Sequence, residues 1–458
     1  MNFDTSLFEK YNKATPRYTS YPPANYFKEL IDYKTVVQAI SASNDAEPQN
    51  ISIYIHIPFC HQLCLYCGCN TKITSNQSKM SEYVDTLIKE IALLKPLLNS
   101  DRKISQIHWG GGTPNYLPIE EIQRIMHQFQ ANFDFIANPE IAMECHPAHL
   151  TKAYVDELVF LGFNRLSFGV QDFSDKVLET VNREKPLLPI EEIVAHIKSH
   201  KNISLNLDFI YGLPFQDLEA YKKTMEKAVA LDPDRLAVFS YAHVPWIKKQ
   251  QTKLERFGLP SAEEKIALFQ SAYDILSAND YTIIGLDHFA KPTDELSIAL
   301  REKQLHRNFQ GYCTRQTTGQ VYALGVSGIS QMADSYLQNT KDIKKYTEAI
   351  NKGVFPIEKF YIVSKEEKIV RDIIERIMCN MEVNLKDVAQ HFDISLKEIY
   401  EITQVDLESL ETFKAEGFLS FDNDFLQLTD KGQFFMRIIA AAFDPNMRNN
   451  TKNFSKAL

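Results

Sequence analysis

From residue 51 onward, short apolar runs rich in β-branched residues alternate with longer amphipathic stretches, and this alternation limits the fold more than any other feature. The runs lie at 51–57, 103–109, 140–145, 165–171, 203–210 and 235–242. The stretches between them have helical spacing, as Val84, Leu87 and Ile91 show by falling on one helical face. Strands joined by crossover helices form parallel sheets. We therefore predict an α/β domain that begins near residue 51.

Polar or glycine residues follow the C-terminal ends of these predicted strands. The strands end at a cysteine-rich loop, Gly110–Gly112, Glu144, Gln171, Asp208 and Tyr241–His243. A (β/α) barrel places its active site at this end of its strands. An open doubly wound sheet instead concentrates functional groups near one switch point. The spread over many strands therefore favours a full or partial (β/α) barrel.

Segments of different character flank the predicted barrel. Within residues 1–50, "PRYTSYPPA" at 16–24 is too rich in proline and tyrosine for a helix and indicates an extended arm. After about residue 350 the pattern is helical, and it ends in a predicted hairpin that turns at Asp422–Asp424 before Thr429 caps a last helix. We predict an arm and helix over 1–50, the barrel and its extension over 51–350, and a winged-helix-like helical domain over 351–458.

Charge bears on the function of this tail, because many winged helices bind DNA. The chain carries 50 Lys and Arg against 59 Asp and Glu, a formal net charge of −9. Nucleic-acid binders usually carry a basic patch, and the last segment is not strongly basic. We expect a lid or a partner surface and no nucleic-acid partner. A polyanionic ligand would need a local basic pocket, because the overall field repels it.

The sequence also indicates where the protein works. The start of the chain lacks a basic region followed by an apolar run, and no apolar stretch is long enough to cross a bilayer. A disulfide framework would need an oxidising compartment, whereas clustered reduced cysteines point to a metal, a cluster or catalysis. We expect a soluble, cytoplasmic, monomeric protein without membrane insertion.

Four of the seven cysteines gather in "HIPFCHQLCLYCGCN" at 56–70, namely Cys60, Cys64, Cys67 and Cys69. Thiolates at i, i+4 and i+7 can hold three corners of an iron–sulfur cube, whereas fully ligated clusters use four cysteines at other spacings. Structural zinc needs four ligands, usually in two separated pairs. We predict that the first three cysteines ligate one 4Fe-4S cluster and that Cys69 does not. Zinc binding and an incidental surface cluster are the alternatives.

A glycine run, "HWGGGTP" at 108–114, ends the next predicted strand. Glycines allow the backbone to come close to a ligand, although they also form simple tight turns. An iron left without a protein ligand can be chelated by the amino and carboxylate groups of an α-amino acid. The glycine run lies one βα unit after the cysteine loop, so the two motifs together predict one ligand site.

These two motifs resemble those of the radical S-adenosylmethionine (SAM) enzymes. Further segments, among them "YNKATPRYTSYPPA", "GFNRLSFGVQDF", "DFIYGLPFQ", "GLDHFAKPTDEL" and "HRNFQGY", are similar to the oxygen-independent coproporphyrinogen III oxidases over nearly the whole chain. The resemblance implies a partial barrel with a C-terminal helical domain closing over it. It also implies a three-cysteine 4Fe-4S cluster with SAM on the open iron, and an oxidoreductase of haem biosynthesis. The reaction would convert two propionates of coproporphyrinogen III to vinyls, giving protoporphyrinogen IX, with an unidentified electron donor and acceptor.

The resemblance further implies two bound SAM molecules. By motif position, the cluster-bound SAM would contact Tyr54, Gly111, Glu144 and Ile329, and the second would contact Tyr66, Gly112, Thr113, Gln171, Arg183, Asp208 and Ala242. The catalytic candidates are Tyr54, Glu144 and Gln310. A carboxylate suits an ammonium group or ribose hydroxyls, and an arginine suits a carboxylate. Helix caps or internal ion pairs are the alternatives for Glu144 and Asp208.

The substrate carries four carboxylates, and Arg17, Arg307 and Gln310 are the candidates to bind them, with surface arginines as the alternative. One departure from the family pattern is "ECHPAHL", where His146 and Ala148 replace an acidic residue and an arginine, so an ion pair at the barrel mouth is in doubt.

Two rival functions remain open from the sequence. The related haem-binding chaperones carry an aromatic residue where this chain has Cys69, and an H-N-x-x-Y-W motif where it reads "HRNFQGYC". Both differences favour the oxidase. A radical SAM enzyme that acts on haem itself is the second alternative, since it would reuse a porphyrin pocket.

Overall fold

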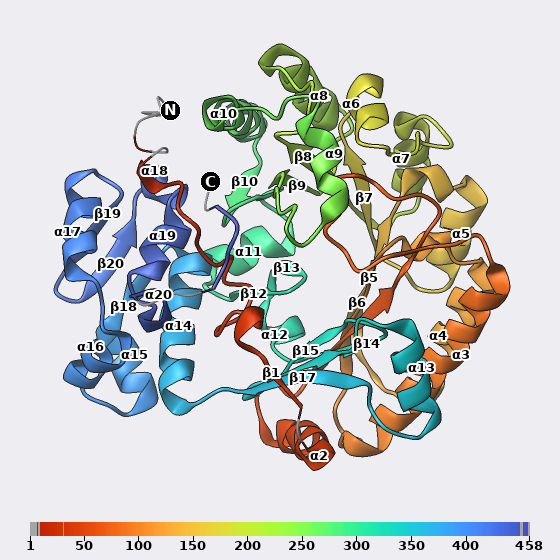
Figure 1. Ribbon diagram of the computed structural model, residues 1–458, viewed down its shortest axis with the longest axis horizontal. Coiled ribbons are helices and arrows are strands. Elements are labelled where there is room, and N and C mark those ends of the chain that lie inside the picture. Colours follow the sequence, from red (N-terminus) through yellow and green to blue (C-terminus); the bar gives the residue numbers. More distant parts are fainter. Residues whose placement is uncertain (1–6, 8–9, 31, 449–451, 457–458) are drawn as a thin grey trace.

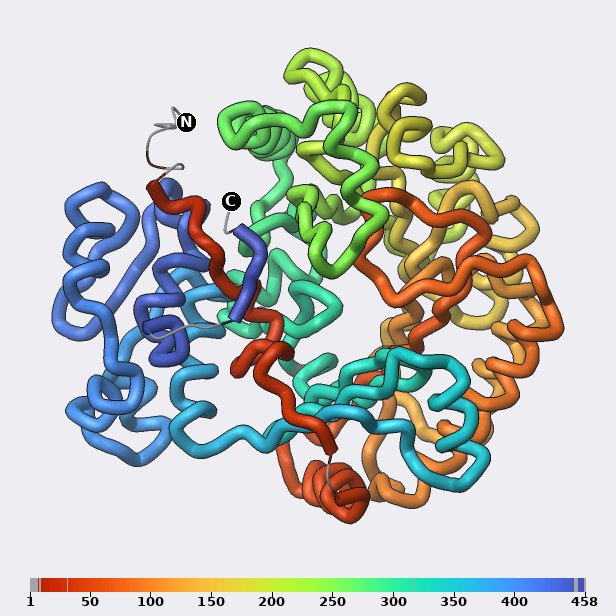
Figure 2. Tube along the Cα trace, in the orientation of Figure 1, coloured from red at the N-terminus to blue at the C-terminus, as the bar shows by residue number. Residues whose placement is uncertain are grey.

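The computed structural model describes residues 7, 10–30, 32–448 and 452–456. Residues 1–6, with which the predicted arm begins, lie outside the described part. A large body of sheet and helices lies beside a smaller, mainly helical C-terminal domain, and the N-terminal arm runs between the two (Figure 1). Figure 2 shows the last described segment of the chain beside this arm.

One curved sheet of 13 strands dominates the described part of the chain, in the order β1-β17-β16-β15-β14-β2-β5-β6-β7-β8-β9-β11-β10. Its centre is parallel: β14 (Val321–Leu324), β2 (Ile51–Ile57), β5 (Ile104–Gly111), β6 (Phe135–Cys145), β7 (Arg165–Gln171), β8 (Ser204–Tyr211) and β9 (Arg235–Ser240). In the described residues β1 and β10 stand at opposite ends of this order. The sheet is therefore a partial barrel, which confirms the predicted fold class.

Antiparallel strands extend both edges of this parallel centre. Beyond β9 lie β11 (His288–Ala290) and β10 (Thr282–Ile284), and beyond β14 lie β15 (Ile329–Gln331), β16 (Ser335–Asn339), β17 (Ile357–Ile362) and β1 (Lys28–Glu29). Outside the main sheet, β3 (Phe59–Cys60) pairs with β4 (Lys72–Ile73) and β12 (Leu305–Asn308) pairs with β13 (Gly311–Thr314). The β3–β4 pair fixes the two ends of the cysteine loop.

Helices cover the outside of the sheet (Figure 1). They are α2 (Tyr33–Ala42), α3 (Gln77–Leu94), α4 (Ile119–Asn132), α5 (Lys152–Phe160), α6 (Asp175–Thr180), α7 (Ile190–Ser199), α8 (Leu218–Ala230), α10 (Ala262–Ala278) and α13 (Ile343–Asn351). Three short helices lie elsewhere: α9 (Thr252–Glu255) packs against the cysteine loop, and α11 (Glu295–Arg301) and α12 (Arg315–Thr318) contact the β12–β13 pair. On α3, Val84, Leu87 and Ile91 are buried, as their spacing predicts. Strand β2 is buried along almost its whole length, as both faces of a parallel strand are in such a fold. None of the described helices is long and apolar enough to span a membrane.

The C-terminal domain consists of α14 (Lys365–Asn380), α15 (Leu385–Phe392), α16 (Leu396–Thr403), α17 (Leu407–Ala415), α18 (Asp430–Gln433), α19 (Met436–Ala441), α20 (Pro445–Arg448) and the strands β18 (Glu382–Asn384), β19 (Leu419–Asp422) and β20 (Phe425–Leu428). The hairpin β19–β20 turns at Asn423 and Asp424, both with positive φ, as the sequence predicts. The Thr429 hydroxyl accepts the Gly432 N–H at 3.0 Å and caps α18. The domain has the predicted winged-helix-like order of helices followed by a small hairpin.

The N-terminal arm belongs to the core of this C-terminal domain. Tyr11, Tyr18 and Tyr21 are buried in its hydrophobic cluster. The hydroxyls of Tyr18 and Tyr21 donate to the Asp444 carboxylate at 3.1 and 2.9 Å. The Thr15 N–H donates to the carbonyl of Ser455 at 3.1 Å, which joins the arm to the last described segment. The arm is therefore a built-in part of the domain rather than a loose extension.

Candidate active site

The cysteine loop lies at the C-terminal end of β2, between β3 and β4. Cys60, Cys64 and Cys67 are partly buried, and Cys69 is exposed. Each of the first three sulfurs accepts a hydrogen bond from a different group. Thr113 Oγ1 donates to Cys60 at 3.3 Å, Arg183 Nη1 to Cys64 at 3.6 Å, and the Cys69 N–H to Cys67 at 3.4 Å. Such donors stabilise negative charge on sulfur.

The cysteines differ in their tendency to ionise. Hydrogen bonding from Cys69 lowers the pKa of Cys67 to about 6, whereas burial raises the pKa of Cys60 to about 11. The pKa of Cys69 is raised well above its usual value, chiefly by its hydrogen bond to Cys67. Thiolates are the ligands of iron–sulfur clusters. Three hydrogen-bonded sulfurs on one short loop are thus a donor set that fits a 4Fe-4S cluster, with Cys69 acting as a donor to one of them.

A cavity of about 170 Å³ adjoins the loop at the barrel mouth. Besides the cysteines, it is lined by these residues of the predicted SAM sites: Tyr66, Gly111, Gly112, Thr113, Glu144, Gln171, Arg183 and Asp208. The structure thus brings together eight of the predicted SAM contacts. Among the described residues, Gln171 leaves its buried Oε1 atom without a hydrogen-bond partner. A buried acceptor of this kind, in a polar cavity wall, is suited to a ligand.

The glycine run packs against the protein's own side chains. A Cβ atom at Gly110 would lie 2.7 Å from Glu144 Oε1, and one at Gly111 would lie 2.7 Å from the His56 ring. At Gly112 it would lie 2.7 Å from the carbonyl oxygen of Pro58. All three positions therefore exclude a side chain already in the described structure. Close approach of the backbone to a ligand stays a prediction.

Glu144 and Asp208 occupy neighbouring strand ends in different surroundings. Glu144 Oε1 accepts a hydrogen bond from His108 Nε2 at 3.1 Å, so the internal ion pair considered from the sequence has a partner here when His108 is protonated. Asp208 accepts hydrogen bonds from Ser167 at 2.8 Å and from Asn206 at 2.7 Å. Burial, together with the Glu144 charge, raises the pKa of Asp208 to about 6. Neither carboxylate caps a helix.

Arg183 is the cation of this cavity. Its Nη1 donates to the Tyr66 hydroxyl at 2.8 Å as well as to Cys64, and its Nη2 donates to the Gly169 carbonyl. Among the described residues, no carboxylate forms an ion pair with Arg183. A partly buried guanidinium without a carboxylate partner is suited to bind the carboxylate of a ligand.

A second cavity, of about 380 Å³, lies on the other side of the cysteine loop. It is lined by Tyr54, Ile329 and Gln310 of the predicted residues, and Cys69 lines both cavities. Tyr54 and Ile329 thus line a different cavity from Gly111 and Glu144. Tyr54 is nevertheless linked to both of those residues, because its ring stacks on His108, the partner of Glu144, and its hydroxyl lies 3.3 Å from Nδ1 of His56, whose ring lies against Gly111. Here the buried amides of Gln310, Asn308 and Gln331 each leave an atom without a partner among the described residues.

A third cavity, of about 600 Å³, lies between the barrel edge and the C-terminal domain. It is lined by Arg17, Arg307 and Ala242 of the predicted residues, so Gln310 lies apart from the two arginines. Arg307 is buried, donates from Nε to the carbonyl of Arg17 at 3.3 Å, and stacks over the Tyr312 ring at 4.3 Å. Its Nη1 atom has no partner among the described residues. Arg307 is therefore not the surface arginine that the sequence left as an alternative.

Two histidines at the barrel mouth, His61 and His149, were not found by sequence reasoning. Glu184 accepts hydrogen bonds from His61 at 2.6 Å and from His149 at 3.2 Å. His146, which marks the departure from the family pattern, accepts the Ala148 N–H at 3.1 Å. Burial and the Arg183 charge lower the pKa of His146 to about 2, so this ring is neutral. No sequence spacing links these residues, because they come from three separate βα units.

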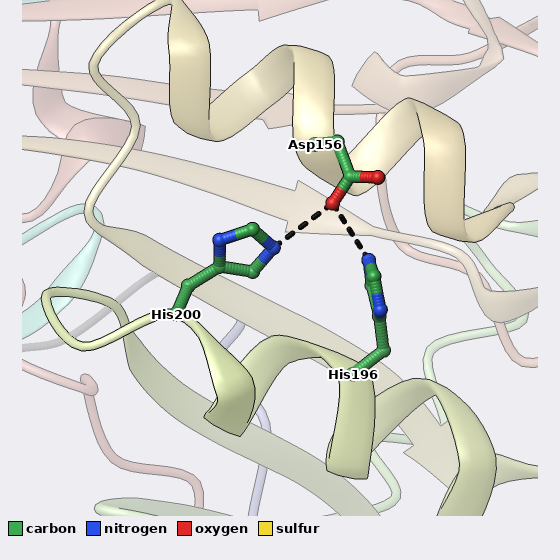
Figure 3. A group of neighbouring side chains, drawn as sticks. All are labelled: Asp156, His196 and His200. Atoms are coloured by element: carbon green, nitrogen blue, oxygen red, sulfur yellow. Dashed lines mark hydrogen bonds and ion pairs between the residues drawn. The ribbon is translucent and has the colours of Figure 1, made fainter.

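Another cluster lies away from the barrel mouth, on the outer helices α5 and α7 (Figure 3). Asp156 accepts hydrogen bonds from His196 Nε2 at 2.7 Å and from His200 Nε2 at 2.9 Å. The donor atoms of all three residues lie within 4.8 Å of one another. The two hydrogen bonds join α5 to α7, which accounts for the arrangement without a ligand.

Comparisons with known proteins match the whole chain. The radical SAM superfamily model matches residues 54–228, and the HemN C-terminal domain model matches residues 363–435. Curated proteins named oxygen-independent coproporphyrinogen III oxidase are similar over their full length. The one from Synechocystis sp. is 39% identical, covering 100% of this chain and 98% of that protein, and the one from Escherichia coli K12 is 38% identical, covering 100% and 99%.

A solved structure is also similar, that of coproporphyrinogen III oxidase (HemN) from Escherichia coli, which is described as a radical SAM enzyme. It superimposes with a TM-score of 0.88 at 38% identity and covers 97% of this chain and 99% of that one. The partial barrel with its cysteine loop thus defines a radical SAM enzyme, whose cofactors are a 4Fe-4S cluster and SAM. Within this class, the chain belongs to the oxygen-independent coproporphyrinogen III oxidase family.

Proposed function

We propose that this protein catalyses the oxygen-independent oxidative decarboxylation of two propionates of coproporphyrinogen III, giving protoporphyrinogen IX. The observation that carries the proposal is the three-cysteine loop beside a polar cavity at the barrel mouth, in a chain whose full length matches coproporphyrinogen III oxidases. The same matches weigh against a haem chaperone or a haem-modifying enzyme.

Cys60, Cys64 and Cys67 hold the cluster in this proposal, and Cys69 donates a hydrogen bond to Cys67 without ligating iron. The cluster and SAM, when bound, supply one-electron reduction and hydrogen-atom abstraction, which no side chain can supply. The protein supplies binding, orientation and exclusion of water. Each propionate loses CO₂, one hydrogen atom and one further electron, so an outside electron donor and an outside acceptor are both required.

The SAM-binding residues follow from the first cavity. Arg183 binds a carboxylate, and Gln171 and Asp208 bind polar groups such as an ammonium or ribose hydroxyls. Glu144, held by His108, lies on the Gly111 side of the same cavity. Tyr54, Ile329 and Gln310 line the second cavity, which shares Cys69 with the first. Two cavities meeting at the cysteine loop support the expectation of two SAM molecules.

An anaerobic assay tests the proposed function. Protein reconstituted with iron and sulfide is incubated with a one-electron reductant, SAM, an electron acceptor and coproporphyrinogen III. We expect loss of two carboxyl groups from the substrate and formation of 5′-deoxyadenosine. A Cys64→Ala variant is the control and should give neither product. SAM cleavage that occurs with haem but not with coproporphyrinogen III would refute the proposal.

Three further expectations belong to this proposal. The protein acts as a monomer in the cytoplasm, and its units are an arm and helix over 1–50, the barrel and its extension over 51–350, and a C-terminal helical domain over 351–458. Sedimentation of the purified protein tests the oligomeric state. Mild proteolysis tests the boundaries, since domain boundaries fall in exposed linkers that proteases cut first.

A further inference from the structure

The wall of the cavity of about 600 Å³ carries cations from five separate parts of the chain. Arg17 comes from the arm, Lys265 from α10, Arg437 from α19 and Lys456 from the last described segment. Arg307, on β12, completes the set of cations. The volume of the cavity lies within the range of roughly 300–1,000 Å³ that is found for small-molecule sites. Elements distant in sequence thus bring five positive charges to one cavity, in a chain whose net charge is −9.

Negative charge is scarce in this cavity. Asp287 is the carboxylate among its described lining residues, and it is already bonded to His288 Nδ1 at 2.7 Å. Arg17, Lys265 and Arg307 form no ion pair with any carboxylate in the described part of the chain. Arg437 donates to the carbonyls of Thr15, Pro16 and Lys456, which ties the arm to the last segment.

Lys265 is a largely buried cation with little compensation. Its ammonium makes one long hydrogen bond among the described residues, to the carbonyl of Tyr241 at 3.4 Å. Its stem packs against Gly212, where a Cβ atom would lie 2.9 Å from Lys265 Cε. Gly212 has φ +87° and directly follows β8, so the backbone bends to leave room for the lysine.

The charges of this cavity repel one another. Burial and the charges of Arg17 and Lys456 lower the pKa of Lys265 to about 8. Burial and the charges of Arg17 and Arg307 likewise lower the pKa of Arg437. Like charges are normally separated or paired with carboxylates in a folded protein. A cluster left in this state is relieved by binding an anion.

The cavity opens at the ends of the strands that carry the first cavity. Tyr66 lines the first cavity and Ala242 lines the basic one, and the Gln251 side-chain amide joins them by donating to both carbonyls, at 3.0 and 3.2 Å. A ligand with several carboxylates on a large ring could therefore keep some in the basic cavity while another part lies at the barrel mouth.

We propose that the basic cavity binds the carboxylates of the tetrapyrrole that are not reacting, and that Lys265 is a substrate-binding residue. This rests on the proposed function, since it takes coproporphyrinogen III as the substrate. Two of its four propionates react and two remain in the product, so the two that remain need cationic partners throughout. Lys265, with Arg17 and Arg307 beside it, supplies them. Arg437 holds the arm and the last segment in place as walls of the cavity.

Matched lysine variants test this assignment in reconstituted enzyme. Lys265→Met keeps the stem that packs on Gly212 and removes the charge, and Lys265→Arg keeps the charge. Lys253→Met, on an exposed lysine of α9 that does not line the cavity, is the control. We expect Lys265→Met to raise KM for coproporphyrinogen III about ten- to a hundredfold. Lys265→Arg should have a KM close to that of the wild type, and the iron content of all the variants should equal that of the wild type.

Porphyrin binding separates this inference from the proposed function. Coproporphyrin III carries all four propionates, and protoporphyrin IX keeps the two that remain after the reaction. Fluorescence titration should show that Lys265→Met weakens both by a similar factor, while Lys253→Met weakens neither. Equal affinities of wild type and Lys265→Met would overturn the inference even if the wild type is an active oxidase. Loss of affinity for coproporphyrin III alone would place Lys265 on a reacting propionate and refute the assignment.

The pH dependence of kcat/KM distinguishes a substrate-binding lysine from a lysine with a purely structural role. The ionisable groups that face Lys265 across the cavity are Arg17, Tyr211, Tyr241, His243, Asp287, Arg307, Arg437 and Lys456. Lys265 loses its charge as the pH rises above about 8, and Arg437, whose pKa is lowered to about 9, follows in both proteins, so the comparison with Lys265→Arg isolates the lysine. We expect kcat/KM of the wild type to fall there and that of Lys265→Arg to fall less. Identical profiles for the two proteins would contradict the assignment.

Discussion

At the scale of single residues, the cysteine loop shows how much of a site a sequence motif can predict. The spacing of Cys60, Cys64 and Cys67 predicts three ligands. The structure adds that each sulfur accepts a hydrogen bond from a different partner and that Cys69 is one of these donors. Thr113 lies one βα unit after the cysteine loop, and Arg183 lies several βα units after it. Their contact with the loop depends on the folded barrel, so no local spacing could have revealed it.

Single alanine variants of the four cysteines should fall into two groups. Cys60→Ala, Cys64→Ala and Cys67→Ala each remove one of three ligands, so we expect loss of cluster absorption and of most bound iron. Cys69→Ala removes no ligand and should keep its iron, because its contact with Cys67 is made by the backbone N–H as well. Iron and sulfide analysis after identical reconstitution is the measurement. Equal iron loss in all four variants would contradict the three-ligand arrangement.

Arg17→Ala should weaken substrate use without loosening the arm. The side chain is exposed and lines the basic cavity, whereas the arm is held by the buried residues Tyr18 and Tyr21. Loss of a guanidinium–carboxylate contact should lower kcat/KM for coproporphyrinogen III about ten- to a hundredfold. Iron content and SAM cleavage by reduced enzyme should persist. The control is Lys13→Ala, at an exposed residue of the arm that does not line the cavity. An unchanged kcat/KM for Arg17→Ala would show that Arg17 is a surface charge without a role in substrate binding.

Lys265→Met should make the protein more stable near pH 7. The folded-state pKa of Lys265 is about 8, below its usual 10.5, so the unfolded chain binds more protons between these values. The free energy of unfolding of the wild type therefore rises as the pH rises from about 8 to 10.5. Below about pH 8, the buried Lys265 charge destabilises the folded protein to its full extent. We expect a gain on the order of 1–3 kcal/mol at pH 7 that shrinks towards pH 10. Thermal unfolding of the reconstituted proteins at several pH values tests this.

At the scale of elements, the predicted strands correspond to β2 and β5–β9 with small shifts at their ends. Strand β6 begins at Phe135 rather than at residue 140, since its first half is largely exposed and contains Pro139, which hides the strand pattern. The short strands β10, β11 and β15–β17 were not predicted, because their pairing partners rather than their own sequences define them.

The tail shows the same limit for helices. The sequence indicated a helical pattern after about residue 350 without placing the boundaries between its helices, and the structure has α15, α16 and α17 after α14. Helices α15 and α16 end at Asp393 and Gln404, which adopt left-handed conformations with φ of +52° and +47°. Such ends are usually marked by glycine. Without glycine, the sequence gives no clear stop signal between neighbouring helices.

Asp444→Ala should release the arm from the C-terminal domain. The Asp444 carboxylate accepts hydrogen bonds from the buried hydroxyls of Tyr18 and Tyr21, and removing it leaves both without this acceptor. We expect a loss of about 2–4 kcal/mol in the free energy of unfolding. Faster proteolysis within the arm should accompany it. The control is Glu411→Ala, at an exposed carboxylate on α17, which should change the free energy of unfolding by less than about 0.5 kcal/mol. If proteolysis left the arm intact in both variants, Asp444 would not be the residue that holds the arm.

At the scale of the whole molecule, the arm, the barrel edge and the C-terminal domain converge on the basic cavity. The sequence predicted the need for a local basic pocket, from a net charge of −9 and a tetra-anionic substrate. It pointed to Arg17 and Arg307 through family motifs, but Lys265 lies in an ordinary amphipathic helix without a motif. Only the packing of α10 beside the arm and α19 reveals its position in the cavity.

The same arrangement predicts that the winged-helix-like domain does not bind DNA. A DNA-binding wing contacts phosphates with cationic side chains, but the tip of the β19–β20 hairpin carries Asp422 and Asp424. The nearest lysines neutralise these carboxylates, since Lys414 pairs with Asp422 at 2.9 Å and Lys386 with Asp424 at 3.4 Å. The domain's contacts are instead made with the arm, through Tyr11, Tyr18 and Tyr21.

Fluorescence anisotropy with labelled duplex DNA therefore should show no binding near physiological ionic strength, while coproporphyrin III binds the same preparation. A double variant, Asp422→Lys with Asp424→Lys, is the matched test of the electrostatic reason. It replaces two negative charges by two positive ones at the tip and should add weak, salt-sensitive DNA binding without changing porphyrin affinity. Salt-sensitive DNA binding by the wild type would show that the acidic hairpin tip does not prevent binding, and would contradict this prediction.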